Sequence, residues 1–535
     1  MIYMRLSIEK SLLASLIAAV LLSNISCNKM LDISPEKYIV STETYYADKT
    51  QLETALKGVY AILANGTLYG GVILGRLGLE ADEGFIHYSV DRNTISYYEG
   101  VVTDTKILSY WRDLYAGINR ANFLLASVDN PSIDIEETDR NNIKGQALFL
   151  RAYFYLMLAT RFGGVPLILE PSTSAKIEDV QVPRTPVKEV YDKIIADMTQ
   201  AADLVYDVSK VESAGRVSKS AVWGVLARTC LYAAGNPVND VSRYAEAASW
   251  AKKVIQSGEH ALNPSYRQIF INYAQDLYDI KESILEVEFY GNGTGIYSNT
   301  GGQVGRNNGI QYSGSADWGY SIGAIHPTIW LYNIYSDNDL RRDWAIAPYR
   351  YNADTIQYWS PTANVMGRNS GKFRREYETL LPKNAATTPE NFPLLRYSDV
   401  LLMYAEALNE VNHAPLPEAY EAMNQVRRRA IGVDANTPDP AVDITSMDYE
   451  EFKSEIKKER ARELCFEALR KDDLIRWGDF VTNMKNGLLE IPSSTASYVT
   501  SAVVYYTGAT ARNVLWPIPS YEIGVNGKLE QNPGW

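Results

Sequence analysis

The chain has 535 residues, of which 46% are hydrophobic and 22% charged, and its formal net charge is −12. This composition is typical of a globular protein with a large core. An acidic chain without a stripe of Lys and Arg argues against a nucleic-acid partner, because contacts to phosphates need clustered cations. The chain has 38 Tyr and 10 Trp against only 12 Phe. That bias favours surfaces where apolar ring faces and polar groups are both needed.

The first 26 residues are typical of an export signal. A basic start precedes an uncharged apolar run over residues 11–22, which is too short to span a bilayer. The run is followed by Cys27 after a small residue, which resembles a bacterial lipobox, although Asn24 stands where Leu is usual. We therefore expect residues 1–26 to be a lipoprotein signal peptide and Cys27 to be acylated. An ordinary signal peptide with a coincidental cysteine is the alternative.

Helical periodicity dominates the rest of the chain. The expected helices span residues 50–64, 109–128, 141–162, 186–207, 218–235, 243–257, 398–411 and 417–431. The third is apolar nearly all round, which predicts burial between neighbours, and Thr185 and Ser218 are expected N-caps. The last two helices form a pair over residues 398–431, which matches the tetratricopeptide period, whereas the pair over 218–257 is longer. The sequence thus predicts an irregular repeat.

Two regions lack this periodicity. Residues 290–323 are rich in Gly, Asn, Ser and Tyr, and residues 65–104 form a second loop zone. Long loops in a compact protein are usually functional or disordered. We expect a mainly α fold, in which an irregular tetratricopeptide-like scaffold of helix pairs carries long ligand-binding loops and little β structure. An N-terminal region, 27–280, and a C-terminal region, 281–535, are expected to form one compact body.

Sequence patterns for catalysis are weak. Residues 319–323 match G-x-S-x-G but lack the strand and helix that a nucleophile elbow needs on either side. A glycosidase needs two carboxylates around the scissile bond, and Glu80, Asp82 and Glu83 are candidates, but acidic loop residues are common in a chain of this charge. The four histidines have no metal-ligand spacing. We expect no catalytic residue, no cofactor and no metal site.

Several motifs together resemble one family over nearly the whole mature chain. They comprise a helix with Trp111, Tyr115, Ile118, Ala121, Asn122 and Leu124, and the segments 151–156, 161–167, 395–407, 456–478 and 517–535. These resemble the SusD/RagB family of surface glycan-binding lipoproteins of the Bacteroidetes. Ala468, Lys471, Gly527 and Trp535 depart from the usual residues, at positions that affect packing.

The resemblance implies a tetratricopeptide-containing helical fold in a lipid-anchored protein of the outer membrane that faces the cell exterior. It also implies a complex with a SusC-like TonB-dependent transporter, to which the protein delivers a glycan or oligosaccharide without cleaving it. Peptide capture by the same fold is the main alternative, and a surface glycoside hydrolase is a weaker one. Among the matching residues, Arg151, Arg396, Glu459 and Arg462 are expected to be buried ion-pair partners, because buried charges are retained only if paired.

Aromatic loop residues are the expected ligand platform, because the apolar C–H faces of sugars lie flat on Trp and Tyr. The candidates are Trp318, Tyr320, Tyr312, Tyr297, Tyr97 and Tyr98, with Asp82, Arg306 and Asn308 as partners for hydroxyl groups. In an extended loop, residues two apart project to the same side, so Trp318 and Tyr320 are predicted to form one shelf. The alternative is that Trp318 fastens the loop to the scaffold beside Trp330.

Overall fold

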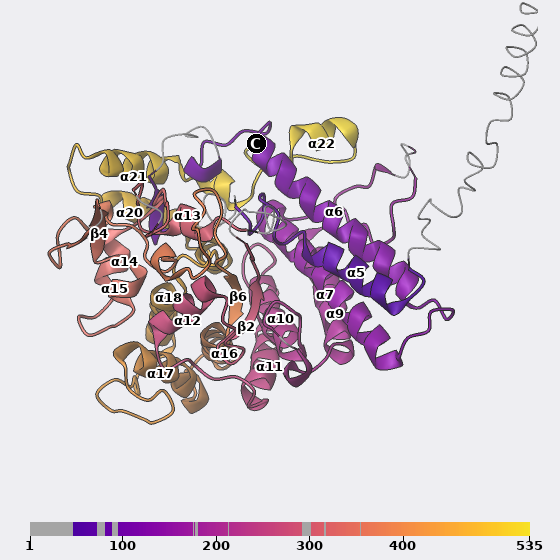
Figure 1. Cartoon of the computed structure of the whole chain (residues 1–535), viewed down its shortest axis with the longest axis horizontal. Helices are drawn as coiled ribbons and strands as arrows, with labels where there is room; N and C mark the ends of the chain where they lie inside the picture. Colours follow the sequence, from indigo (N-terminus) through magenta and orange to yellow (C-terminus); the bar gives the residue numbers. More distant parts are fainter. Residues whose placement is uncertain are drawn as a thin grey trace, which may run out of the picture.

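The computed structural model describes residues 46–71, 81–87, 95–174, 176, 180–211, 213–291, 301–314, 317–353 and 355–535. The expected signal peptide, Cys27 and Tyr297 lie outside these residues. Helices make up most of the described chain, while its strands are few and short (Figure 1). The expectation of a mainly α fold with little β structure is therefore confirmed.

The N-terminal half is a layer of long helices, drawn in indigo to magenta in Figure 1. They are α5 (Lys49–Tyr60), α6 (Thr105–Val128), α7 (Glu137–Phe162) and α9 (Val187–Leu204). Helix α7 packs against both α6 and α9. Its residues 145–162 are buried apart from Thr160, so the buried helix expected there is confirmed.

Side-chain caps explain where some of these helices begin. The hydroxyl of Ser218 accepts a hydrogen bond from the backbone N–H of Ala221 and starts α10 (Lys219–Ala234), as expected. The expectation for Thr185 is wrong, because α9 has no side-chain cap and Pro186 is extended, with ψ 139°. The physical reason is that Thr185 pairs with Val165 in an isolated β-bridge, which keeps the chain extended until the next residue.

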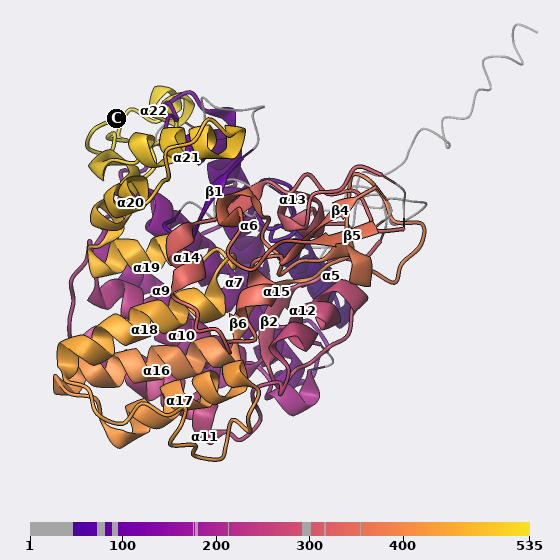
Figure 2. The same cartoon turned by 90° about the vertical axis from the view of Figure 1, so that its left-hand side faces the viewer.

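Helix pairs form the centre of the molecule. Helix α10 pairs with α11 (Arg243–Gln256), and α16 (Tyr397–Asn412) pairs with α17 (Pro417–Ile431). The two pairs stack, because α11 also packs against α16, and α18 (Tyr449–Leu464) covers α16 (Figure 2). This arrangement agrees with the expected tetratricopeptide-like pairing and with its irregularity.

Shorter elements complete the fold around these pairs. The remaining α-helices are α12 (Tyr266–Gln275), α13 (Val304–Asn308), α14 (Ile329–Asn333), α15 (Arg342–Ala345), α19 (Arg470–Trp477), α20 (Phe480–Leu489), α21 (Ser497–Gly508) and α22 (Ser520–Val525). The strands are β1 (Gly84–Ile86), β2 (Ser283–Val287), β3 (Ile325–Pro327), β4 (Tyr349–Asn352), β5 (Thr355–Tyr358) and β6 (Phe392–Arg396). They pair antiparallel as β1–β3, β2–β6 and β4–β5.

The described parts of the first loop zone include short regular elements. Within residues 65–104 the chain forms β1 and a 3₁₀ turn, Ile95–Tyr97, and β1 pairs with β3, which directly follows the second loop zone. Helix α21 packs against both β1 and the 3₁₀ turn. These contacts bring the two zones together and bury part of the first one.

Buried ion pairs cross the interior of the helical scaffold. The guanidinium of Arg396 lies 2.8 Å from carboxylate oxygens of Glu463 and Glu467, and all three side chains are buried. Burial opposes ionisation of Glu463, but the guanidiniums of Arg429 and Arg396 outweigh it and hold the pKa of Glu463 well below its usual range. Arg151 pairs with Asp197 at 2.7 Å. Arg151 and Arg396 therefore act as scaffold, as expected.

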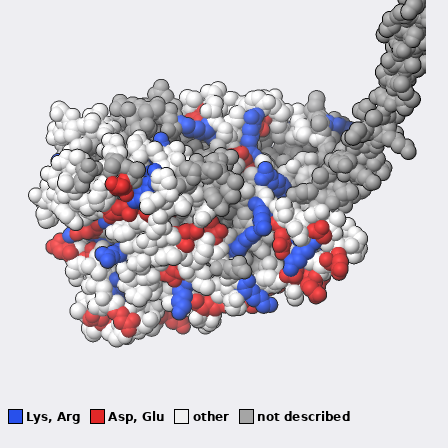
Figure 3. Space-filling model, viewed as in Figure 1, with Lys and Arg blue, Asp and Glu red and all other residues white. Residues whose placement is uncertain are grey.

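The ion pairing expected for Glu459 and Arg462 is also confirmed. Glu459 pairs with Arg341 at 2.7 Å and with Arg462 at 3.3 Å, inside the scaffold. On the face shown in Figure 3, Lys and Arg side chains of the described residues lie interspersed with Asp and Glu side chains.

The two remaining cysteines are buried thiols. Cys230 and Cys465 are free, and burial raises the pKa of Cys465 to about 12, which keeps that thiol protonated and inert at neutral pH. No helix within the described part of the chain has the length and apolarity to cross a membrane.

Candidate functional site

Three of the expected site residues, Tyr312, Trp318 and Tyr320, lie in the loop between α13 and β3, which directly follows Arg306 and Asn308 on α13. Tyr312 and Ser321 exchange two backbone hydrogen bonds of 2.8 and 2.9 Å, which hold these two points of the loop together. Between Trp318 and Tyr320, Gly319 has φ +80°, a conformation that favours glycine. The loop is therefore not extended at this point, and the geometry from which a common shelf was predicted is wrong.

Trp318 and Tyr320 remain half-buried, each with its own aromatic or cationic neighbour. The ring of Trp318 lies 5.0 Å from that of Tyr351, tilted by 37°. The guanidinium of Arg306 lies 5.8 Å from the ring centre of Tyr320. Trp330 packs elsewhere, against the core around β1 and α20 and beneath Arg470. We call Trp318, Tyr320 and Tyr351 the aromatic loop face.

Tyr351 contacts two aromatic rings of the loop and is itself held by a carboxylate. It lies on β4, and its ring also contacts that of Tyr312 at 5.1 Å. Its hydroxyl and that of Tyr349 donate hydrogen bonds of 2.6 and 2.7 Å to the two carboxylate oxygens of Glu376. Burial raises the pKa of Tyr351 far above its ordinary value, so the phenol stays neutral and keeps donating.

Charged groups fix the backbone behind the rings. The guanidinium of Arg375 pairs with Glu378 at 2.6 Å and donates a hydrogen bond of 2.6 Å to the carbonyl of Tyr320. The ammonium of Lys383 donates to the carbonyl of Asp317 at 2.7 Å. The rings of the aromatic loop face are thus presented by a braced loop, which reduces the conformational entropy lost when a ligand binds.

Two of the other expected residues are buried behind the aromatic loop face. Tyr312 and Asn308 are buried, and the carbonyl of Asn308 accepts a hydrogen bond of 2.7 Å from the hydroxyl of Ser370. The ring of Tyr312 packs against that of Tyr351, and neither Tyr312 nor Asn308 offers an exposed surface. Arg306 is half-buried beside Tyr320 and is the polar candidate nearest a half-exposed ring.

The expectation of exposed rings is wrong for Tyr97 and Tyr98. They are only 2% and 1% exposed and belong to the core around β1 and α20. The ring of Tyr98 contacts those of Tyr505 at 5.2 Å and Phe480 at 5.8 Å. The reason is tertiary: α21 covers this segment, and its cover is supplied by residues some 400 positions away, which no local pattern reveals.

Asp82 is also buried and is not exposed to a ligand on a surface loop. It forms a two-pronged ion pair with Arg470, at 2.7 and 2.9 Å, and accepts a hydrogen bond from Asn483 at 2.8 Å. Its carboxylate borders a polar cavity of about 160 Å³ beside Trp330 and Glu490. With most of its acceptor capacity used inside the protein, Asp82 acts mainly as a structural anion.

The residues considered for catalysis are placed unfavourably for it. Burial raises the pKa of Glu83 to about 8, the range of a general acid, but its side chain is buried and accepts from the backbone N–H of Phe466. Ser321 in the G-x-S-x-G match is buried, and its hydroxyl donates to the carbonyl of Arg306 at 3.1 Å. Both groups read as structural.

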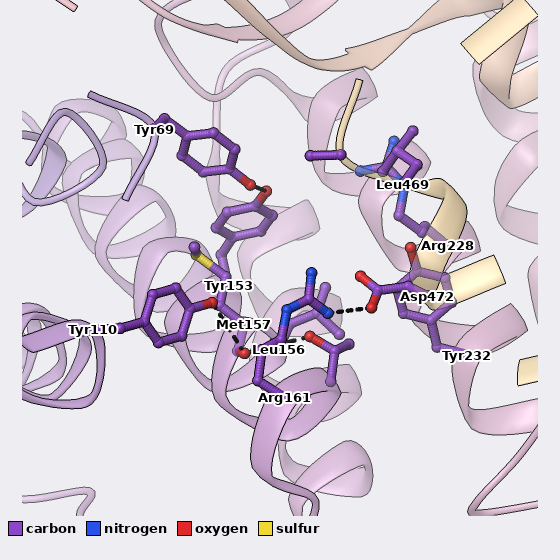
Figure 4. Close-up of a pocket in the computed structure, with 12 residues that line it drawn as sticks. Tyr69, Tyr110, Tyr153, Leu156, Met157, Arg161, Arg228, Tyr232, Leu469 and Asp472 are labelled. Carbon is purple, nitrogen blue, oxygen red and sulfur yellow. Dashed lines mark hydrogen bonds and ion pairs between the residues drawn. The ribbon is translucent and has the colours of Figure 1, made fainter. Parts of the chain in front are cut away.

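A second cavity, within the helical core, is too small for a sugar. Its volume is about 40 Å³, and α6, α7, α10 and α19 supply most of its lining (Figure 4). Tyr69 and Tyr153 share a hydrogen bond of 2.7 Å there, and Arg161 pairs with Asp472. A polar cavity of this size holds about one or two water molecules. Within the described residues, no group of three or more His, Cys, Asp or Glu is placed to hold a metal ion.

Sequence reasoning missed Tyr349, Tyr351 and Glu376, although part of the pattern was present. Tyr349-Arg350-Tyr351 alternates aromatic and polar residues in β4, and β5 follows after a tight turn, which is the pattern of a hairpin with aromatic residues on one face. Glu376 has no such pattern, since it reaches both hydroxyls from a 3₁₀ turn, Arg375–Tyr377.

Known proteins resemble this chain along almost its whole length. The model described as "SusD family" matches residues 281–535, and the one described as "Starch-binding associating with outer membrane" matches residues 29–231. SusD-like protein P2 of Formosa agariphila is 26% identical, over 93% of this chain and 95% of that protein.

Solved structures share the fold. A SusD homologue from Bacteroides thetaiotaomicron superposes with a TM-score of 0.85 at 29% identity, covering 94% of this chain and all of the other. Surface glycan-binding protein A from Bacteroides fluxus has a TM-score of 0.69 at 23% identity, covering 91% and 99%. The two family matches cover residues 29–231 and 281–535 and the relatives span the chain, so this protein belongs to the SusD/RagB family.

Proposed function

We propose that this protein captures a glycan or oligosaccharide at the cell surface and delivers it, uncleaved, to a SusC-like TonB-dependent transporter of the outer membrane. The aromatic loop face carries the proposal. Trp318 and Tyr320 present half-exposed rings on a braced loop beside the guanidinium of Arg306. Ring faces bind the C–H side of a sugar and guanidinium N–H groups bind its hydroxyls, so the pairing suits a carbohydrate. The names of the related surface glycan-binding protein and of the starch-binding family model agree with a glycan as ligand.

The first experiment measures binding and turnover side by side. The purified mature chain is applied to an array of polysaccharides and oligosaccharides, and binding to the positive glycans is quantified by calorimetry. A reducing-sugar assay on the same mixtures tests for cleavage. We expect binding without release of reducing ends. Turnover of a bound oligosaccharide would establish a glycoside hydrolase, and binding confined to peptides would establish peptide capture, and either result would contradict the proposal.

The proposed anchor is the acylated thiol of Cys27. Two acyl chains are needed for stable membrane attachment, because a single chain gives marginal affinity. We expect the Cys27→Ala protein to lose its association with outer membranes when the transporter is deleted, whereas a Cys230→Ala protein keeps it, because that thiol is buried. Quantitative recovery of Cys27→Ala protein in the outer-membrane fraction of that strain would refute the anchor. Protease treatment of intact cells then tests whether the protein faces the exterior.

The proposed partner is a SusC-like barrel, bound through the faces of the helix pairs rather than through the aromatic loop face. A lid that stays on a transporter needs a large interface, above about 2,000 Å². Extraction in mild detergent from cells grown on the inducing glycan, followed by pull-down of a tagged chain, should recover the barrel. Recovery of the chain alone under these conditions would contradict the partnership.

A further inference from the structure

A cavity of about 770 Å³ lies beside the β4–β5 hairpin. Its walls come from the start of α12, from α15, from the hairpin and from the end of α17. The lining includes five aromatic side chains: Tyr266, Trp344, Tyr349, Tyr358 and Tyr377. Its volume falls within the range of about 300–1,000 Å³ that is common for small-molecule sites. Nothing in the fold requires so many rings around an open space.

The aromatic residues change from buried to exposed toward the rim. Trp344 and Tyr349 are buried, whereas Tyr358 is 71% exposed and Leu340 is 61% exposed. The rings of Tyr349 and Tyr358 lie 5.6 Å apart. A large aromatic side chain left exposed beside a cavity usually marks an interaction site. The rim therefore offers apolar faces to a ligand that also enters the cavity.

Hydrogen-bond donors in the lining lack protein acceptors. The indole N–H of Trp344 and the Nε–H of Arg429 are buried and have no hydrogen-bond partner among the described residues. Both groups donate and cannot accept, and a buried donor is normally satisfied. The guanidinium of Arg374 lies 3.9 Å over the Trp344 ring. It donates to three backbone carbonyls and to the Tyr349 hydroxyl, which hold it in place over this ring. Rings combined with spare donors suit the hydroxyl oxygens and C–H faces of a sugar.

Glu376 joins this cavity to the aromatic loop face. One of its oxygens accepts from Tyr349, which lines the cavity, and the other accepts from Tyr351. The rings of these two tyrosines are 5.8 Å apart, and Tyr351 contacts Trp318 at 5.0 Å. An unbroken series of aromatic rings thus runs from the loop to the cavity.

We propose that the cavity is a second carbohydrate-binding site, which receives sugars of the same chain beyond those that lie on the aromatic loop face. This inference rests on the proposed function. Two sites on one chain raise affinity through effective concentration, so long chains bind more tightly than short ones. The protein therefore selects polymers or long oligosaccharides rather than short fragments.

The test compares variants in native gels cast with laminarin, amylopectin, xylan, galactomannan, alginate or polygalacturonate. The cavity variants are Tyr358→Ala and Arg267→Ala, because both side chains are exposed at the rim and their loss should not affect folding. The loop variant is Trp318→Ala. Tyr521→Ala is the matched control, since Tyr521 is 57% exposed on α22 and lines neither site. Trisaccharides prepared from each polysaccharide that retards the wild type are then titrated by calorimetry.

Each outcome decides between the two sites. We expect the cavity variants to weaken polymer binding by about threefold to tenfold, the range of one aromatic contact, and to leave trisaccharide binding unchanged. Trp318→Ala should weaken both, and Tyr521→Ala neither. Polymer binding by the cavity variants at wild-type strength, with loss in Trp318→Ala, would overturn the second site while the proposed function stands. Loss of binding in the cavity variants alone would show that the primary site is the cavity. Absence of binding by the wild type to every polysaccharide would contradict the proposed function itself.

Discussion

The helical scaffold and the aromatic loop face use polar groups in opposite ways. In the scaffold, a buried charge cluster, comprising Arg341, Lys372, Arg396, Arg429, Glu282, Glu459, Glu463 and Glu467, satisfies its charges internally. At the aromatic loop face, half-buried rings keep surface available, and their polar partners fix the loop backbone and the hydroxyl of Tyr351. The motifs that reveal the family lie in the scaffold, whereas ligand recognition is assigned to residues outside those motifs. Family membership is therefore easier to establish than the ligand.

The strongest test of this contrast is Arg396→Met. The substitution leaves Glu463, Glu467 and Glu282 buried with a positive partner removed. Breaking a buried pair from one side costs about 3–5 kcal/mol. We expect a loss of this size in the free energy of unfolding, measured by urea denaturation, and no loss of glycan affinity in protein that remains folded.

The matched control is Arg112→Met, which removes an exposed ion pair with Glu522. Exposed pairs contribute about 0.2–1 kcal/mol. Equal stability losses for the two variants would contradict the view that the buried charge cluster holds the scaffold together.

Trp318→Ala tests the other side of the comparison. Removal of a ring that contacts the ligand should weaken glycan binding by about 1–3 kcal/mol, the range measured for stacking of bases on aromatic side chains. The melting temperature should stay nearly unchanged, because the ring is half-buried on a loop braced by other groups. Trp250→Ala is the control, since Trp250 is also half-buried but lies on α11. A lower melting temperature with intact affinity would make Trp318 a packing residue.

Glu390 sharpens the comparison, because it is a buried carboxyl without the pairing seen in the buried charge cluster. Both of its oxygens lack hydrogen-bond partners within the part of the chain that the structure describes, and burial together with the charge of Glu378 raises its pKa to about 8. Between pH 4.5 and 8 the native state therefore keeps a proton that the unfolded chain loses, so its contribution to stability is full below pH 4.5 and is lost as pH rises to 8.

The side chain of the Glu390→Gln variant cannot ionise. Between pH 5 and pH 8, its free energy of unfolding should therefore fall by about 1–3 kcal/mol less than that of the wild type. Urea unfolding at the two pH values measures this difference. Glu53→Gln on α5, where the side chain is 45% exposed, should behave as the wild type does. Identical pH dependence of Glu390→Gln and the wild type would show that Glu390 is already ionised in the native state.

The smallest expected effect belongs to Tyr351→Phe. The substitution keeps the ring against Trp318 and removes only the hydrogen bond to Glu376. One such bond contributes about 0.5–1.5 kcal/mol to stability, or somewhat more when the acceptor is charged. We expect a small fall in the midpoint of thermal unfolding and little change in affinity. A large loss of affinity would mean that the hydroxyl, rather than the ring, serves the ligand.

The helices of the scaffold could be predicted from the sequence, whereas the exposure of the loop rings could not. Helices such as α7 and α10 were predicted to within a few residues, because period and caps are local properties. Burial of Tyr97 and Tyr98 could not be predicted, since their cover comes from Tyr505 and its neighbours near the C-terminus. Long-range contacts decide which loop rings are exposed, and a single sequence does not carry that information in any local pattern.

A crystal structure with a bound oligosaccharide tests the central claim most directly. The glycan selected on the array is trimmed to six to eight sugars and soaked into crystals of the mature chain. We predict a pyranose ring lying flat on Trp318, with hydroxyl groups bonded to Arg306, and the chain continuing past Tyr351. A sugar bound instead beside Trp330 and Asp82, with no density on Trp318, would contradict the assignment of the aromatic loop face as the binding site.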